Sequence, residues 1–230
     1  MTSSPRSLLA VFDCDGTLVD SQHAILACMT AAFVGDGLAA PDAEAVRRVI
    51  GLPLAQCMAR LAPEEPEPRQ ARLTEAYKHA FFALRQRPDH HEPMFDGAVA
   101  ALDALEADGY LLGIATGKAR RGLLAVLERH GLAHRFDTLQ TADSGPGKPD
   151  PTMLRRAMAE TGAEAADTVM VGDTTFDMLM AHSAGVHAIG VGWGYHPAAE
   201  LIAAGADALV NRFDELPGMI SRLKRRVECA

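Results

Sequence analysis

The sequence predicts an α/β fold, namely a doubly wound parallel sheet with an all-helical insertion after its first strand. From residue 96 onward, short apolar runs alternate with amphipathic helical stretches, which is the pattern of parallel βαβ units. Between residues 19 and 87 only helical patterns occur. An apolar strand that ends in acidic residues precedes this helical stretch. The chain therefore divides into a sheet-forming part and a helical part.

The domain boundaries follow from where the pattern changes. We expect an α/β core domain over residues 1–18 and 92–230, interrupted by a helical domain over residues 19–91. Hinges near Asp20 and residues 88–93 would let the helical domain close over a cleft of the core. With 230 residues, the chain is long enough for two such domains.

The first strand comprises the apolar residues 8–12 and ends at Asp13. A short continuous apolar run is typical of a strand buried on both faces of a parallel sheet. Asp13 and Asp15 lie two residues apart, so in extended backbone they point to the same side, and Cys14 points away. Two adjacent carboxylates repel, which raises one pKa or attracts a cation, and we expect the raised pKa at Asp15. Gly16 allows a sharp turn close to a ligand.

Four helices are expected in the insertion. The first spans residues 19–33, where apolar side chains recur with helical spacing. A second begins at Pro41 and ends near Gly51, and Pro53 begins a third. The fourth covers residues 73–84 and is the most clearly amphipathic of the group.

The remaining elements alternate in type. Strands are expected at residues 111–115, 136–140, 168–171, 187–191 and 208–210. Helices are expected at residues 96–108, 118–130, 150–161 and 174–184. Ligands of such sheets bind at the carboxyl ends of the strands, so the residues that follow each strand are the candidates for chemistry.

Polar residues follow three of these later elements. Thr116-Gly117-Lys118 follows a strand and offers a hydroxyl and backbone amides to an anion, although Thr116 could also be a simple helix cap. Lys148 lies among turn-forming residues and could be a fixed cation or a solvated one. Asp173 and Asp177 follow another strand, four residues apart, and could bind a hard cation or cap a helix.

Composition and charge narrow the class of protein. The net charge of −8 argues against a nucleic-acid or anionic-membrane surface, and no apolar run is long enough to span a bilayer. The cysteines are widely spaced, and the apolar run before Asp13 is too short for a signal peptide, so we expect reduced thiols in a cytoplasmic protein. The cysteines are Cys14, Cys28, Cys57 and Cys229.

These motifs together resemble those of the haloacid dehalogenase superfamily. The resemblance covers nearly the whole chain and rests on Asp13-Cys-Asp-Gly-Thr-Leu18, Thr116, Lys148, and Gly172-Asp173 to Asp177. The helical insertion resembles the C1 cap of that superfamily. The stretches 15–21, 147–151 and 171–174 are similar to its phosphoglycolate-phosphatase-like branch. Dehalogenases lack an acid at the position of Asp15, so the chain looks like a phosphoryl-transfer enzyme.

The resemblance implies a role for each motif residue. Asp13 would be the nucleophile that forms an aspartyl phosphate, and Asp15 the general acid and base. Thr116 and Lys148 would complete the catalytic group. Mg²⁺ would be held by Asp13, the backbone carbonyl of Asp15, Asp173 and Asp177, and Lys148 would pair with Asp177. The phosphate would contact Gly16, Thr116, Gly117 and Lys148.

The cap would select the substrate. Arg47 and Arg48, with Gly51-Leu52, lie where the C1 caps of the resembling family often reach the substrate, and Arg48 is our candidate contact. A solvated helix explains both arginines at least as well. Tyr77 and Phe81 are expected in the core of the cap rather than in a binding surface. The expected partner is a small phosphorylated metabolite, and the chain would be a monomer or homodimer.

Several functions fit the resemblance. The first is a Mg²⁺-dependent phosphatase of a small phosphomonoester such as phosphoglycolate. The alternatives are a phosphomutase similar to β-phosphoglucomutase, a pyrophosphatase, and a non-catalytic phosphate-binding protein. The last of these usually lacks an acid or the lysine, and this sequence has both.

Overall fold

A six-stranded sheet, with all neighbouring strands parallel, forms the centre of the molecule in the order β3-β2-β1-β4-β5-β6. The computed structural model describes residues 7–228, with side chains through Lys224. The strands are β1 (Ser7–Phe12), β2 (Tyr110–Ala115), β3 (Thr138–Gln140), β4 (Ala163–Gly172), β5 (His187–Val191) and β6 (Ala208–Val210). The predicted α/β fold class is confirmed. Because the strands are parallel, their carboxyl ends share one edge.

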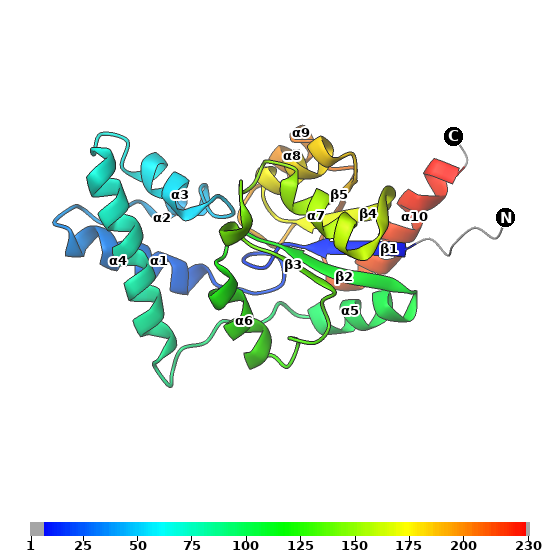
Figure 1. Cartoon of the computed structure of the whole chain (residues 1–230), viewed down its shortest axis with the longest axis horizontal. Coiled ribbons are helices and arrows are strands. Elements are labelled where there is room, and N and C mark those ends of the chain that lie inside the picture. Colours follow the sequence, from blue (N-terminus) through cyan, green and yellow to red (C-terminus); the bar gives the residue numbers. More distant parts are fainter. Residues whose placement is uncertain (1–6, 229–230) are drawn as a thin grey trace.

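Helices cover both faces of the sheet, as a doubly wound fold requires (Figure 1). Successive side chains of β1 point to opposite faces. Ala10 and Phe12 pack in one hydrophobic cluster and Leu9 and Val11 in the other. The first cluster includes α5 (Ala98–Ala107), α6 (Arg120–Arg129) and α10 (Leu216–Glu228). The second includes α7 (Thr152–Thr161), α8 (Thr175–Ala184) and α9 (Ala198–Ala203).

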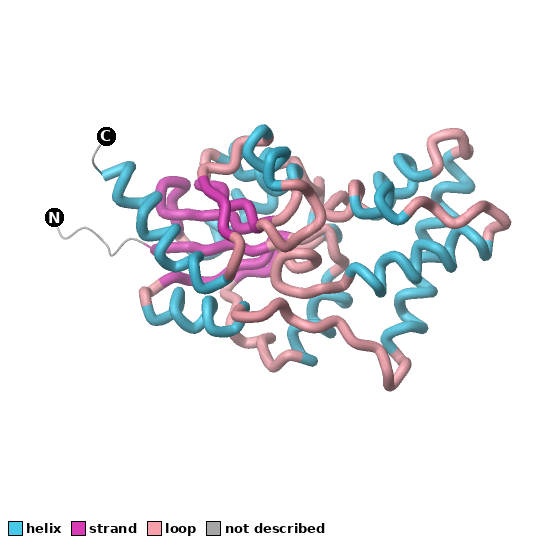
Figure 2. Tube along the Cα trace, turned by 180° about the vertical axis from the view of Figure 1, so that it is seen from behind, coloured by secondary structure: helices cyan, strands magenta, loops and turns pink. Residues whose placement is uncertain are grey.

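The inserted helices form a separate group at one end of the molecule (Figures 1 and 2). They are α1 (Gln22–Gly35), α2 (Ala43–Arg47), α3 (Leu54–Leu61) and α4 (Glu67–Arg85). We call this group the helical insertion. It has its own hydrophobic cluster, which includes Ile25, Phe33, Met58 and Leu73. The insertion faces the edge of the sheet at which β1 ends.

The two linkers between the sheet and the helical insertion lie side by side. The amide of Asp20 donates to the carbonyl of Pro93 (2.8 Å), and the amide of Phe95 donates to the carbonyl of Leu18 (3.0 Å). Val19 and Met94 form an antiparallel bridge between these bonds. The chain therefore leaves and returns to the core at one place.

Several boundaries differ from the prediction. Helix α1 begins at Gln22 rather than at residue 19, because Val19 is held in the bridge with Met94. Helix α2 ends at Arg47, and Gly51 lies beyond it with a positive φ of 98°. Strand β4 begins five residues earlier than predicted, and α9 was not predicted at all.

The cysteines agree with the expected reduced state where they are described. Cys14, Cys28 and Cys57 are buried free thiols, and Cys229 lies outside the described residues. Within the described part of the chain, every helix is too short or too polar to cross a bilayer.

Candidate active site

Strand β1 delivers two carboxylates to the edge of the sheet. The amide of Asp13 still donates to Val171 of the neighbouring strand (2.9 Å), so Asp13 is fixed at the end of the hydrogen-bonded sheet. Gly16 then turns the chain with φ of 86°, and its amide donates to the carbonyl of Val19 (2.9 Å). Asp13 and Asp15 are both buried, and Cys14 packs in the hydrophobic core, as the alternation predicted.

Asp13, Asp173 and Asp177 converge from two strand ends. One carboxylate oxygen from each lies within 4.8 Å of the others, and all three residues are buried. Asp177 also closes a capping box, because its Oδ2 accepts from the amide (3.0 Å) and hydroxyl (2.7 Å) of Thr174. The capping and the cluster explanations of Asp177 therefore both hold. We call these three residues the acid cluster.

Lys148 lies between two members of the acid cluster. Its Nζ is 2.8 Å from Oδ2 of Asp13 and 2.6 Å from Oδ1 of Asp177, and the side chain is fully buried. The predicted ion pair with Asp177 is confirmed. A buried ammonium is stable only where such partners compensate its lost hydration. Lys148 is therefore a fixed cation and not a solvated one.

One lysine does not neutralise three buried carboxylates. Burial raises the pKa of Asp13 to about 6, against the attraction of Lys148 and with added repulsion from Asp177. Burial also raises the pKa of Asp173 well above its usual range, and repulsion from Asp13 adds to it. An arrangement of oxygen ligands with excess negative charge suits a hard divalent cation such as Mg²⁺. The residues present therefore fit the predicted metal.

Asp173 is oriented by hydrogen bonds from other elements. Its Oδ1 accepts from the hydroxyl of Thr17 (2.8 Å), and its Oδ2 accepts from the amide of Tyr195 (2.9 Å). Gly16 leaves the space that this carboxylate occupies, because a Cβ at Gly16 would lie 2.4 Å from Oδ2 of Asp173. Gly16 therefore shapes the acid cluster through close approach.

Asp15 has a different environment from Asp13. Both of its oxygens contact Nζ of Lys118, at 2.7 and 3.0 Å, and Oδ1 accepts from the hydroxyl of Ser21 (2.6 Å). Burial alone would raise the pKa of Asp15, but the attraction of Lys118 and these hydrogen bonds lower it below its usual value. The expectation that Asp13 would raise the pKa of Asp15 was wrong, since Lys118 outweighs that repulsion.

Thr116 and Gly117 follow β2 at the same edge. The Thr116 hydroxyl accepts from the amide of Lys118 (3.2 Å), and α6 begins only at Arg120 with Ala119 as its cap. Thr116 is therefore not the cap of α6. A Cβ at Gly117 would lie 2.7 Å from the carbonyl of Gly51, so the helical insertion touches this loop.

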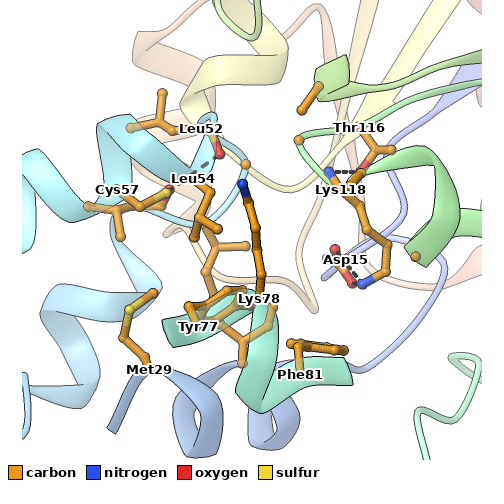
Figure 3. Close-up of a pocket in the computed structure, with 18 of the residues that line it drawn as sticks. Asp15, Met29, Leu52, Leu54, Cys57, Tyr77, Lys78, Phe81, Thr116 and Lys118 are labelled. Atoms are coloured by element: carbon orange, nitrogen blue, oxygen red, sulfur yellow. Dashed lines mark hydrogen bonds and ion pairs between the residues drawn. The ribbon is translucent and has the colours of Figure 1, made fainter. Parts of the chain in front are cut away.

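A cavity of about 250 Å³ lies between the helical insertion and the strand ends. Asp13, Asp15, Thr116 and Gly117 line its core side. Figure 3 shows Met29 and Tyr77 of the insertion across from Thr116 and Lys118. The remaining wall is mostly apolar and includes Ile25, Val49, Ile50, Leu52, Leu54, Phe81 and Phe82.

The structure brings four of the nine predicted site residues to this cavity, namely Asp13, Asp15, Thr116 and Gly117. Asp173 and Asp177 lie in the acid cluster, Gly16 and Lys148 lie against it, and none of these four lines the cavity. Arg48 does not line it either, because its guanidinium pairs with Glu200 (2.5 Å) and with Glu44 (3.3 Å). Tyr77 and Phe81 belong to the cluster of the insertion as expected, but both also form the cavity wall, which was not predicted.

Four basic residues that line the cavity were given no role from the sequence, namely Lys78, Arg85, Lys118 and Arg121. Lys118 was visible as the last residue of Thr116-Gly117-Lys118, but nothing in that motif indicates its contact with Asp15. Lys78 and Arg85 come from α4, where a charged residue on an amphipathic helix usually indicates a solvated face.

Comparison with known proteins agrees with this arrangement. Residues 10–191 match the family model described as haloacid dehalogenase-like hydrolase. The chain is 38% identical over 211 residues to "Probable phosphatase IndB" of Dickeya dadantii, covering 91% of this chain and 92% of that one. It is 34% identical over 215 residues to a phosphoglycolate phosphatase of Rhodospirillum rubrum, covering 90% and 88%. The crystal structure of a hydrolase from Pseudomonas syringae superposes with a TM-score of 0.82 at 25% identity, covering 94% and 99%.

Proposed function

Because the chain belongs to the haloacid dehalogenase-like hydrolase family, we propose that it is a magnesium-dependent phosphatase that hydrolyses a small phosphomonoester through an aspartyl phosphate. The observation that carries this proposal is the position of Asp13. Its carboxylate lines the cavity and is also held by Lys148 within the acid cluster. A nucleophile, a fixed cation and a set of oxygen ligands thus meet at one point.

Asp13, Asp173 and Asp177, with the backbone carbonyl of Asp15, are the residues that would hold Mg²⁺. When bound, the ion supplies positive charge that reduces the repulsion between an anionic nucleophile and an anionic phosphate. Lys148 contributes to the same end, because its Nζ contacts the Asp13 carboxylate directly. The hydroxyl of Thr116 and the amide of Gly117 would donate to phosphate oxygens.

The reaction has two steps. In the first, a carboxylate oxygen of Asp13 bonds to phosphorus, the bond from phosphorus to the leaving oxygen breaks, and Asp15 donates a proton to that oxygen. In the second, Asp15 takes a proton from water, whose oxygen attacks phosphorus and releases inorganic phosphate and the Asp13 carboxylate. Splitting the displacement in this way replaces one difficult step with two easier ones.

Lys118 and Ser21 hold Asp15 in the ionised form, which is the form that the second step needs. The first step needs the protonated form. An approaching phosphate dianion favours protonation, because nearby negative charge raises the pKa of a carboxyl. Substrate binding and proton uptake at Asp15 are therefore coupled in this proposal.

The helical insertion consists of residues 19–91 and acts as a cap on the core, which comprises residues 1–18 and 92–230. The paired linkers at Asp20 and Pro93 support this division, since both connections cross at one place. The relative named phosphoglycolate phosphatase supports a small phosphorylated acid as the substrate.

Phosphate release from a panel of phosphorylated metabolites tests the proposal. The panel includes phosphoglycolate, β-glucose 1-phosphate and pyrophosphate, each with Mg²⁺ and with a chelator. Asp13→Asn should lower the rate by about 10³-fold or more. Asp108→Asn, at an exposed position after α5, is the matched control and should retain full activity. Metal-independent release, or release that survives in Asp13→Asn, would contradict the mechanism.

A further inference from the structure

The basic side chains of the cavity differ in whether an acid neutralises them. Lys118 contacts Asp15 and lies 3.6 Å from Glu92, and Lys78 pairs with Glu75. Arg121 is exposed. Among the described residues, the guanidinium of Arg85 has no hydrogen bond or ion pair, and its Nε is buried without an acceptor. A buried donor without a partner needs an explanation, and one explanation is a bound group.

The guanidinium of Arg85 has a defined position although it forms no ion pair, and its charge acts on Asp15 only through space, where it helps to lower the pKa of that carboxyl. Its central carbon lies 4.4 Å from the centroid of the Phe81 ring, and the aromatic face attracts the positive charge. On another side it lies against the backbone of α6. A Cβ at Gly122 would be 2.7 Å from Nη2 of Arg85, so a larger residue there would displace the guanidinium from this position. Gly122 lies inside a helix, where glycine costs about 1 kcal/mol relative to alanine.

We propose that Arg85 binds a second anionic group, located on the leaving-group side of the substrate. The substrate would then be a phosphomonoester that also carries a carboxylate or a second phosphate. This inference rests on the proposed function and adds the residue that selects the substrate. A guanidinium presents paired donors in a plane, which matches the two oxygens of a carboxylate or phosphate.

The core and the helical insertion supply different parts of the cavity wall. Asp13, Thr116 and Gly117 line one part of the wall, and Arg85 lines another, from the last turn of α4. Apolar side chains such as Ile25 and Leu54 complete the wall. In this proposal the phosphoryl group lies at Asp13, and a free oxyanion on the leaving group binds Arg85, a cation that forms no ion pair with the described residues. Arg48 is unsuited to this role, because Glu200 and Glu44 already occupy its donors.

Pairs of substrates that differ only in the second anion test this inference. The first pair is phosphoglycolate and ethyl phosphate, and the second is glucose 1,6-bisphosphate and glucose 1-phosphate. We expect kcat/KM of the natural protein to favour the doubly anionic member of at least one pair by about 10- to 100-fold. The pair that shows the preference identifies the second anion as a carboxylate or a phosphate.

Variants assign that preference to Arg85. Arg85→Gln should abolish it, because kcat/KM should fall about 10- to 100-fold further for the doubly anionic member than for the singly anionic one. Gly122→Ala keeps the charge but moves the guanidinium, so it should reduce the same preference. Arg87→Gln is the matched control, because Arg87 is exposed and pairs with Asp89. Thermal melting of each variant establishes that it is folded.

The outcomes separate this inference from the proposed function. The assignment of Arg85 is wrong if Arg85→Gln lowers kcat/KM equally for both members of a pair, or if the natural protein shows no preference between them. The phosphatase proposal stands in either case. If no compound releases phosphate, the phosphatase proposal fails. Calorimetric binding of the same pairs to Asp13→Asn, with and without Arg85→Gln, then decides the role of Arg85 without turnover.

Discussion

The Nζ of Lys118 lies 2.7 Å from one oxygen of Asp15 and 3.0 Å from the other, so one ammonium contacts the whole carboxylate. Two residues earlier, burial is the largest influence on the pKa of Asp13 and raises it to about 6. The pKa of Asp15 is lowered instead. Neighbouring carboxylates of the same strand end thus have opposite shifts, because different lysines and different hydrogen bonds surround them.

Replacing Lys118 with methionine should change the pH dependence of phosphate release. The ammonium lowers the pKa of Asp15, so its removal should raise that pKa. With a higher pKa, a larger fraction of Asp15 is protonated at any given pH. If Asp15 donates the proton to the leaving group, the alkaline limb of the kcat/KM profile should therefore move to a higher pH by about one unit. Lys78→Met, which also alters the cavity wall, should leave the limb in place. An unmoved limb in Lys118→Met would contradict this role.

Replacing Lys148 with methionine should destabilise the fold strongly. Lys148 is the cation between Asp13 and Asp177, and its loss leaves both buried carboxylates without a positive partner at that position. Removing one partner of a buried pair costs about 3–5 kcal/mol in the free energy of unfolding. Urea denaturation measures this cost. Lys78→Met provides the comparison, since the exposed pair with Glu75 should contribute about 1 kcal/mol or less. Equal losses in the two variants would be inconsistent with this account.

The stability of the metal-free protein should fall as pH rises from about 4 to 6. The folded-state pKa of Asp13 is raised from 3.8 to about 6, so the folded protein binds a proton more tightly than the unfolded chain. The resulting stabilisation is present below pH 4 and lost as pH passes 6. The raised pKa of Asp173 acts in the same direction.

Magnesium should therefore stabilise the protein more at pH 8 than at pH 5. At a concentration about 100 times Kd, binding contributes about 3 kcal/mol, or about 5–10 °C in Tm for a chain of this size. At pH 5 protons compete for the acid cluster. Thermal melts with Mg²⁺ and with a chelator at both pH values measure the difference, and Asp173→Asn should remove the shift. The same shift at both pH values would argue against the acid cluster as the ligand set.

Replacing Gly16 with alanine should impair both stability and activity. A Cβ there would lie 2.4 Å from Oδ2 of Asp173, and the φ of 86° is itself unfavourable for alanine. Gly109 has a similar φ of 83° with nothing within 4 Å of its Cβ position. Gly109→Ala should cost about 1–2 kcal/mol and keep full activity. Gly16→Ala should cost more and lower kcat by about 100-fold. Equal activity in the two variants would remove the argument from close approach.

The sequence predicts the sheet and the acid cluster because their signals are local. An apolar run that ends in an acid is visible at Asp13 and again at Asp173, and parallel strands bring such ends together. Lys148 is separated from both along the chain, and the turn-forming residues around it are compatible with a fixed lysine and with a solvated one. Its ion pair with Asp177, which the family resemblance implies, is confirmed by the structure.

The contacts of Asp15 and Arg85 were not predictable in the same way. Lys118 reaches Asp15 through a long flexible side chain, and no periodicity reports where such a chain ends. Arg85 reads as an ordinary charged residue of α4 until the α6 backbone at Gly122 is placed beside it. The first contact depends on how the ends of β1 and β2 lie beside each other, and the second on how the helical insertion packs against α6, and only the tertiary structure contains this information.

The pairing of the two linkers has a consequence for how the chain folds. Because Asp20 and Pro93 are hydrogen-bonded, the two ends of the helical insertion are held together, and the insertion forms one closed loop on the sheet domain. The entropy lost in closing a flexible loop grows only with the logarithm of its length. Changes in the length or sequence of the inserted helices therefore add little to the entropic cost of assembling the sheet. Evolution or design can exchange the helical insertion and keep the edge of the sheet that holds Asp13 unchanged.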